Sequence, residues 1–322
     1  MTLFRDDEDF GEAIRAAART LGLHAQFVEK DYWVTETLRT LSDCYAGHFT
    51  FKGGTSLSKG FGLIERFSED IDILVVPTQG DTRAGHEAKL LDMSRTIAER
   101  LELSLVEDQN PGRGWDAHRA DLLRYEPRVP KTIETGLDEG GVLLETGFAG
   151  GEEPAEMVTI KALLWDGLEG VDPFQYEEGQ PFEVRALAPV RTCLEKICGM
   201  HHLVTKMLES TDLEVPRVGR HYWDIDRLLQ DAGVRKALAD PDGFIDLVVD
   251  VERISARHFD GYTPRPDGGF GVSPAFNPPP TVRGQLDALY NAASVLLPTT
   301  AGSSWPSFGT VLKRIGQSAD LL

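Results

Sequence analysis

The chain has 322 residues, of which 41% are hydrophobic and 26% are charged, and its formal net charge is −19. This length predicts about two globular domains, and the net charge excludes a broad nucleic-acid-binding surface, because affinity for phosphate backbones comes from Lys and Arg. No apolar run reaches the roughly 18 residues of a membrane span and the N-terminal segment is acidic, so we expect a cytoplasmic protein that makes no contact with membranes.

Two helices are predicted first, over residues 6–21 and 25–41. The first has apolar residues at helical spacing and ends at Gly22. The second carries the segment Glu29-Lys30-Asp31-Tyr32-Trp33. Taken alone, these charged residues favour an exposed helix face with side-chain ion pairs.

The stretch from Phe49 to Val76 begins with a predicted strand, a glycine turn and a helix. Residues 49–52 alternate like a strand, Gly53 and Gly54 end it, and Thr55 or Ser56 is predicted to cap a helix that runs towards Gly62. Such a turn directs backbone N–H groups outwards, and its glycines let a phosphate approach the backbone closely. The turn therefore predicts an anion site.

A second strand follows with Asp70-Ile71-Asp72 and an apolar β-branched run. Residues two apart on a strand share a face, so Asp70 and Asp72 point the same way. Two carboxylates on one face favour a shared divalent cation. Either motif alone is commonly a solvated turn or strand end, whereas their order in one strand-turn-helix-strand segment favours a functional site.

Further strands and one long helix complete the first half of the chain. We predict a turn at 79–82, a helix over 87–103, a turn-rich connection at 108–115 and strands over 121–129 and 142–149. Glu145 lies in the otherwise apolar second strand. A carboxylate there is costly to bury unless it is paired or binds a cation, so Glu145 is a candidate third metal ligand; the alternative is a sheet-edge glutamate that faces water.

The composition becomes helical after about residue 186. Residues 157–164 and 182–187 are predicted as strand or strand-helix segments, joined by a solvated acidic connection at 167–181. A clear helix then begins at Pro189 and runs to about residue 208. We therefore expect two domains, over residues 1–185 and 186–322.

The C-terminal region is predicted to be mostly helical. Helical segments are expected over 219–229, 234–260, 282–296 and 308–315, and on the first of these Arg220 and Asp224 share a face. Residues 262–281 are rich in Pro and Gly. They predict either a mobile loop that contacts substrate through Arg265, Phe270 and Phe276, or plain disorder.

Several of these motifs resemble those of the AbiEii/MenT-type nucleotidyltransferase toxins, which belong to the polymerase-β-like superfamily. Lys52 to Ser58 and the run Arg66 to Asp72 resemble its Gly-Ser or Gly-Thr-Ser turn followed by Asp-x-Asp. Glu29 to Trp33, Glu195-Lys196 and Arg220 to Asp224 are similar to its remaining motifs. The resemblance implies an α+β fold, with a mixed sheet flanked by helices and then a helical C-terminal domain.

The resemblance also implies roles for individual residues. The implied catalytic residues are Asp70, Asp72, Lys196 and Asp224; the nucleotide-binding residues are Gly53, Gly54, Thr55, Ser56, Arg66, Ser68 and Lys196; and the metal ligands are Asp70, Asp72 and Glu145. A lysine across the triphosphate would neutralise charge on the leaving pyrophosphate, although composition alone favours a surface lysine at 196. Asp224 would position that lysine or accept a proton from the nucleophile.

The function implied by the resemblance is that of an NTP- and Mg²⁺-dependent toxin, with a two-metal site, that adds nucleotides to the 3′ acceptor end of tRNA and so blocks translation. Its implied partners are NTP, tRNA and a cognate antitoxin protein, which could regulate the toxin as a kinase does. The alternatives are nucleotide transfer to a protein side chain or a small molecule, and a non-catalytic nucleotide-binding module. The intact Asp-x-Asp and Lys196 argue against the last of these.

The acidity of the chain restricts how it could hold RNA. Basic residues lie in or beside the matched motifs, at Lys30, Lys52, Lys59, Arg66, Lys196 and Arg220. If these motifs converge, they predict an electropositive cleft in an acidic protein, which would bind only a few phosphates.

Overall fold

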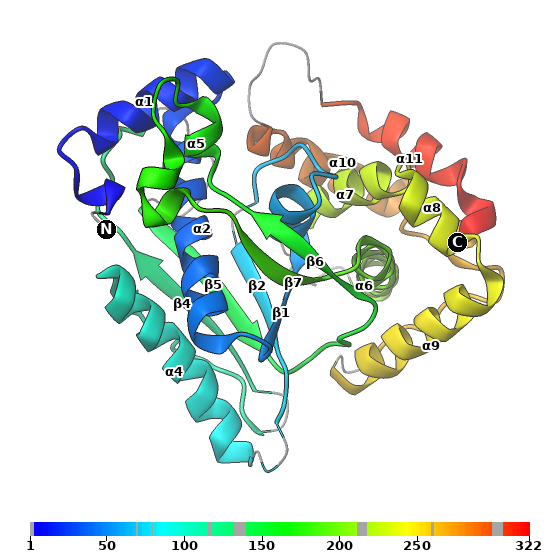
Figure 1. The fold of residues 1–322 in the computed structure, drawn as a ribbon. Helices are drawn as coiled ribbons and strands as arrows, with labels where there is room; N and C mark the ends of the chain where they lie inside the picture. Colours follow the sequence, from blue (N-terminus) through cyan, green and yellow to red (C-terminus); the bar gives the residue numbers. More distant parts are fainter. Residues whose placement is uncertain are drawn as a thin grey trace. The chain divides into compact units, whose positions relative to one another are not determined.

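The computed structural model describes residues 3–68, 70–78, 80, 82–114, 117–131, 140–210, 218–258, 261–297 and 305–322 (Figure 1). The chain forms two compact units: unit 1 is Met1–Leu187 with Leu296–Ser303, and unit 2 is Ala188–Val295 with Ser304–Leu322. The domains over 1–185 and 186–322 stay a prediction. Within the described ranges, no helix is both long enough and apolar enough to cross a membrane.

Unit 1 is built on a mixed sheet of seven strands. Their bounds are β1 (Phe49–Lys52), β2 (Asp70–Val75), β3 (Ser104–Val106), β4 (His118–Arg124), β5 (Gly141–Gly147), β6 (Ala155–Ile160) and β7 (Phe182–Leu187). The spatial order is β3-β4-β5-β2-β1-β7-β6. β1 is antiparallel to β2, whereas β2 is parallel to β5 and β1 is parallel to β7. β2 therefore lies at the centre of the sheet.

Helices pack on the apolar face of this sheet (Figure 1). The helical elements of unit 1 are η1 (Phe4–Asp6), α1 (Phe10–Leu21), α2 (Ala25–Tyr45), α3 (Gly53–Thr55), η2 (Ser56–Gly60), α4 (Arg83–Leu101), α5 (Leu163–Gly167), η4 (Pro173–Gln175) and η5 (Glu177–Gly179). α2 contacts β5 and β7, and α4 contacts β3, β4 and β5. Ile71 and Ile73 of β2 join Tyr32 of α2 in one core. Because side chains alternate along a strand, Asp70 and Asp72 lie on the opposite face.

Unit 2 is helical over its described residues. Its elements are α6 (Pro189–Glu209), α7 (Gly219–Leu228), α8 (Ala232–Leu238), α9 (Pro241–His258), η6 (Phe270–Val272), α10 (Pro280–Ala292), η7 (Ala293–Leu296, whose last residue belongs to unit 1), α11 (Phe308–Gly316) and η8 (Ala319–Leu321). α7 packs against α6, α10 and α11. The predicted fold class, a mixed sheet with flanking helices and a helical C-terminal region, is confirmed.

One prediction of exposed charge is wrong, and a second holds only in part. On α2, Glu29, Lys30 and Asp31 are all buried, so this segment is not a solvated helix face. In the connection at 167–181, the other acidic residues are exposed as predicted, but Glu178 is buried. The carboxylate of Glu178 accepts hydrogen bonds from the Tyr32 hydroxyl and from the Phe4 N–H, which offset the cost of removing it from water.

Several element bounds also differ from the prediction. The strand expected over 121–129 runs from His118 to Arg124, because Pro127 has no N–H to give to a ladder and because a buried ion pair between Arg119 and Asp121, at 2.7 Å, lets charged residues enter the strand. The short strand β3 was not expected. The helix predicted over 234–260 is two helices, α8 and α9, with Pro241 at the start of the second.

The segment 262–281 is neither a substrate-facing loop nor disordered in its described part. Phe270 and Phe276 are buried in unit 2. The Ser273 hydroxyl forms a hydrogen bond with His201 Nδ1 at 2.8 Å. The Arg265 guanidinium bonds the Leu322 carbonyl oxygen and lies over the Phe244 ring. Aromatic burial thus orders a segment whose Pro and Gly content excludes long regular elements.

Candidate active site

The glycine turn is itself the first turn of a helix. α3 begins at Gly53, so the prediction that Thr55 or Ser56 caps the helix is wrong. The Thr55 hydroxyl instead donates to the Asp70 carbonyl oxygen at 2.5 Å, and the Ser56 hydroxyl donates to the Gly53 carbonyl oxygen at 2.9 Å. The helix then continues as the π-helical turn η2, a form that is frequent at functional sites. The Thr55 bond joins the turn to the beginning of β2, and the Ser56 bond lies within the turn.

Both glycines of the turn touch predicted site residues. Gly53 has φ +76°, and a Cβ placed on it would lie 1.8 Å from Asp72 Oδ2. A Cβ on Gly54 would lie 2.8 Å from both Arg66 Nη2 and Ser68 Oγ. The turn therefore runs between the Asp72 carboxylate on one side and the Arg66 and Ser68 side chains on the other. Only glycine fits at this approach.

Three carboxylates follow one face of the sheet. Asp70 and Asp72 are two apart on β2, and Asp72 lies directly opposite Glu145 in the parallel pairing of β2 with β5. Glu145 is exposed, yet it lies on an interior strand and not at a sheet edge. Among the described residues, no group of three or more His, Cys, Asp and Glu side chains is arranged to hold a metal ion. The metal role of Glu145 stays a prediction.

The donor set on β2 fits a magnesium ion that arrives with its substrate. Mg²⁺ is commonly held by one or two carboxylates together with substrate phosphate oxygens. Asp70 and Asp72 supply the two carboxylates, and the contact between Gly53 and Asp72 Oδ2 puts the phosphate-compatible turn directly beside them. Asp70 and Asp72 are therefore the residues that would hold the ion.

A buried ion pair fixes the far end of the glycine turn. Lys59, on η2, lies with its Nζ 2.7 Å from Asp31 Oδ1, and their side chains are only 6% and 10% exposed. The second oxygen of Asp31 accepts the Leu163 N–H at 2.7 Å. The aspartate of α2 thus links the turn to the start of α5. Breaking such a pair on one side costs about 3–5 kcal/mol.

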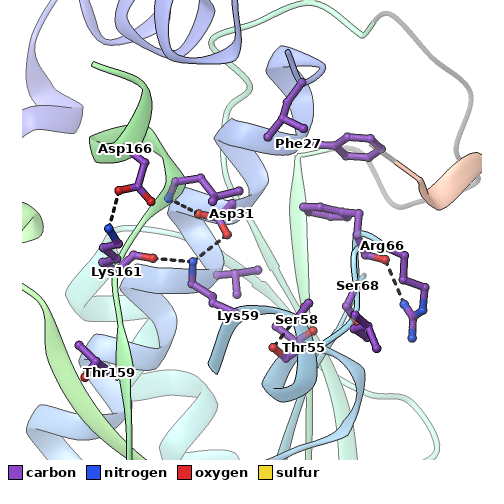
Figure 2. Close-up of a pocket in the computed structure, with 15 residues that line it drawn as sticks. Phe27, Asp31, Thr55, Ser58, Lys59, Arg66, Ser68, Thr159, Lys161 and Asp166 are labelled. Carbon is purple, nitrogen blue, oxygen red and sulfur yellow. Dashed lines mark hydrogen bonds and ion pairs between the residues drawn. The ribbon is translucent and has the colours of Figure 1, made fainter. Parts of the chain in front are cut away.

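A cavity of about 290 Å³ opens beside the turn, within unit 1 (Figure 2). Thr55, Arg66 and Ser68 of the predicted nucleotide site line it. Thr159 and Lys161 line it as well, and sequence reasoning did not select them. No pattern in the sequence indicates that β6 lies beside the turn. In the structure the two meet at Gly60, which lies so close to Val158 of β6 that an added Cβ would be 3.1 Å from it.

In unit 2, Lys196 and Asp224 are brought together. Lys196 Nζ of α6 lies 3.0 Å from Asp224 Oδ2 of α7 and 3.1 Å from His221 Nδ1. The Lys196 side chain is 10% exposed and that of Asp224 is fully buried, so the interpretation of Lys196 as a surface lysine is wrong. Burial, and then the charge of Lys196, lower the pKa of His221 to about 4. His221 is therefore neutral at pH 7, and its Nδ1 accepts a hydrogen bond from the lysine ammonium.

Comparison with known proteins shows which family the chain belongs to. The family model described as "Nucleotidyl transferase AbiEii toxin, Type IV TA system" matches residues 38–286. The chain belongs to this family. A search of solved structures finds similarity to MenT4, a nucleotidyltransferase toxin from Mycobacterium tuberculosis H37Rv, with 16% identity, a TM-score of 0.39 and coverage of 95% of this chain and 97% of that one. A search of curated proteins finds no significant match.

The residues whose motifs resemble those of the family lie in two clusters. In unit 1, Asp72 lies against Gly53, with Arg66 and Ser68 against Gly54. In unit 2, Lys196 pairs with Asp224. The buried Asp31, in the segment that resembles a third motif, holds Lys59 behind the glycine turn. A nucleotidyltransferase of this family uses NTP, and membership of a type IV toxin–antitoxin system implies an antitoxin partner.

Proposed function

We propose that this AbiEii-family nucleotidyltransferase uses Mg²⁺ and NTP to add nucleotides to the 3′ acceptor end of tRNA in the cytoplasm and thereby blocks translation. The single observation that supports catalysis best is the contact of Gly53 with the Asp72 carboxylate, since it sets a phosphate-compatible turn against a metal-compatible pair of acids. The tRNA acceptor comes from the family resemblance, and it is the part that most needs a test.

We assign each chemical role to the residues of one cluster. Mg²⁺ bound at Asp70 and Asp72 would stabilise negative charge on the transferred phosphate. The backbone of Gly53 and Gly54, with the side chains of Arg66 and Ser68, would bind the β and γ phosphates. Lys196 would neutralise the pyrophosphate as it leaves. Because Asp224 is fully buried and contacts Lys196, we assign it to positioning that lysine and not to accepting a proton.

The decisive experiment incubates the pure protein and total tRNA with each α-labelled NTP in turn. We expect label on tRNA, and only when Mg²⁺ is present. Asp72→Asn and Lys196→Met should each lower transfer by about a hundredfold or more, the scale of losing one electrostatic group in a transition state. Wild-type rates in the Asp72→Asn protein would remove the metal assignment.

The location of the label separates the alternatives. Label on a protein band would show a side-chain acceptor, and a labelled low-molecular-weight product that separates from the unreacted NTP would show a small-molecule acceptor. If no acceptor of any class is labelled, and NTP still binds, the chain is a non-catalytic nucleotide-binding module.

A further inference from the structure

Helix α9 of unit 2 carries an apolar strip on its outward side. The helix packs against α6 and α8, and its residues Val248 and Val251 are buried (Figure 1). On the outward side Ile245 is 55% exposed, Val249 is 58% exposed, and Ala256 is exposed two turns further along. Residues at these spacings share one face of a helix. Exposed apolar residues are common on protein surfaces, so this strip alone identifies no partner.

A charged strip runs beside the apolar one. Its members are Asp242 and Asp246 in the first half of the helix and Arg253 and Arg257 in the second half, and all four are exposed. At 3.6 residues per turn they lie within about 60° of one another around the helix axis. Acidic residues near the N-terminus and basic residues near the C-terminus also suit the helix dipole. The order of the charges therefore needs no partner, but their spacing has a further property.

The charged strip is complementary to itself when a second α9 lies alongside in the opposite direction. A two-fold axis near residues 249 and 250 would bring Asp242 of one copy to Arg257 of the other, and Asp246 of one copy to Arg253 of the other. In such an interface each contact occurs twice, because both copies contribute the same surface. Every contact along the strip would thus join opposite charges.

The apolar strip follows the same symmetry. Val249 would contact Val249 of the second copy at the axis, and Ile245 would lie opposite Ala256. A parallel pair of α9 helices would instead put aspartates against aspartates and arginines against arginines, and like charges across an interface oppose association. The two strips together therefore favour an antiparallel pair.

We propose that α9 is a self-association surface through which two copies of this chain form an antiparallel dimer. At a net charge of −19 two copies repel each other at long range, so association needs local complementarity of this kind. Within the described part of the chain, Asp242 and Asp246 form no ion pair. Arg253 bonds the Asp250 carboxylate at 2.7 Å through one nitrogen, and the remaining donors of its guanidinium can reach a second carboxylate.

This surface contains none of the residues assigned to the active site, so the proposal does not depend on the acceptor or on catalysis. A single pair of helices buries little area, and we therefore expect a weak, reversible dimer. Sedimentation velocity of the full chain over a wide range of concentration measures its dissociation constant. A wild-type chain that stays monomeric at every concentration would overturn the proposal.

The first variant places a charge at the axis. Val249→Glu puts two carboxylates against each other in the dimer and should weaken it by about tenfold or more. Val272→Glu is the matched control, because Val272 is 60% exposed and lies in η6, outside α9. It should dimerise like wild type. Thermal melting establishes that both variants are folded. If Val249→Glu dimerises as tightly as Val272→Glu, the contact is not made by α9.

A charge exchange tests the antiparallel register itself. Asp246→Arg and Arg253→Asp each place like charges opposite each other at both symmetric contacts, so each variant alone should dimerise weakly. In an equimolar mixture the two variants should form a heterodimer in which both contacts again join opposite charges, with an affinity near that of wild type. A mixture that associates as weakly as the separate variants would overturn the register.

Discussion

The contact between Gly53 and Asp72 leaves no room for a methyl group, because a Cβ would lie 1.8 Å from the carboxylate oxygen. Gly62 offers a comparison at the same level of backbone strain. It also has a positive φ, of +64°, but a Cβ on it would meet nothing within 4 Å. The two glycines separate the effect of conformation from the effect of contact.

We predict that Gly53→Ala lowers nucleotide transfer by about a hundredfold and that Gly62→Ala leaves it within a few-fold of wild type. Both variants pay about 1–2 kcal/mol for placing a side chain at positive φ, but only the first displaces Asp72. Transfer of α-labelled NTP and thermal melting are the two measurements. Equal activities in the two variants would show that the position of Asp72 is not set by the turn.

At this scale the sequence predicts the residues of the turn and of β2 well, since Gly53, Asp70 and Asp72 lie in one short stretch. It does not predict their supports. The side chains of Asp31 and Lys59 meet across many intervening residues, and Lys161 follows β6, which pairs with β7 and lies against Gly60. Such meetings depend on tertiary structure, which leaves no local pattern in a single sequence.

Helix α2 shows the same limit for a whole element. The sequence predicts a helix over 25–41, so it gives the start of α2 but not its end at Tyr45, and it assigns the charged residues of the helix to solvent. In the structure Glu36 is buried beside Arg39, at 3.2 Å. Burial raises the pKa of Glu36 to about 7, Arg39 opposes that rise, and the neighbouring Glu178 adds to it. A residue pattern shows a helical face, but it does not show that a loop covers that face.

The raised pKa gives stability a definite dependence on pH. The folded state binds the proton of Glu36 more tightly than the unfolded state, whose glutamate titrates near 4.5. The contribution of this residue is therefore complete below about pH 4.5 and is lost as pH rises through about 7. Each pKa unit corresponds to about 1.4 kcal/mol, so the loss is up to about 3 kcal/mol.

We predict that the melting temperature of Glu36→Gln falls less than that of wild type when the pH is raised from about 5 to about 8. Glu99→Gln is the matched control, because Glu99 is exposed on α4. It should follow the wild-type curve. If Glu36→Gln and Glu99→Gln give the same difference between the two pH values, Glu36 is not the group that titrates.

For the whole molecule, a net charge of −19 opposes long-range attraction of RNA. The cations that the structure places at the candidate site are few and already engaged. Lys59 pairs with Asp31, and Lys196 pairs with Asp224. A protein of this kind can hold the end of an RNA strand through a few phosphates, but its net charge argues against an extended cationic surface for a folded tRNA.

We predict that tRNA affinity falls with salt at a slope equivalent to about two to four phosphate contacts. A minimal acceptor-stem hairpin should then compete nearly as well as intact tRNA. Filter binding over a range of KCl concentrations measures the slope. A slope equivalent to about eight contacts or more, or a requirement for the anticodon arm, would contradict the local mode of binding.

The backbone of the nucleotide-site loop depends on a residue that is made much later in synthesis. The Phe67 N–H, between Arg66 and Ser68, donates to the Leu296 carbonyl oxygen at 2.8 Å, and Leu296 belongs to unit 1 although α6 to α10 intervene. A ribosome adds about 5–20 residues per second, so the roughly 230 intervening residues delay this bond by about 10–50 seconds. A nascent chain that has not yet reached Leu296 therefore contains every residue of the Asp-x-Asp motif but lacks the hydrogen bond that holds the loop at Phe67.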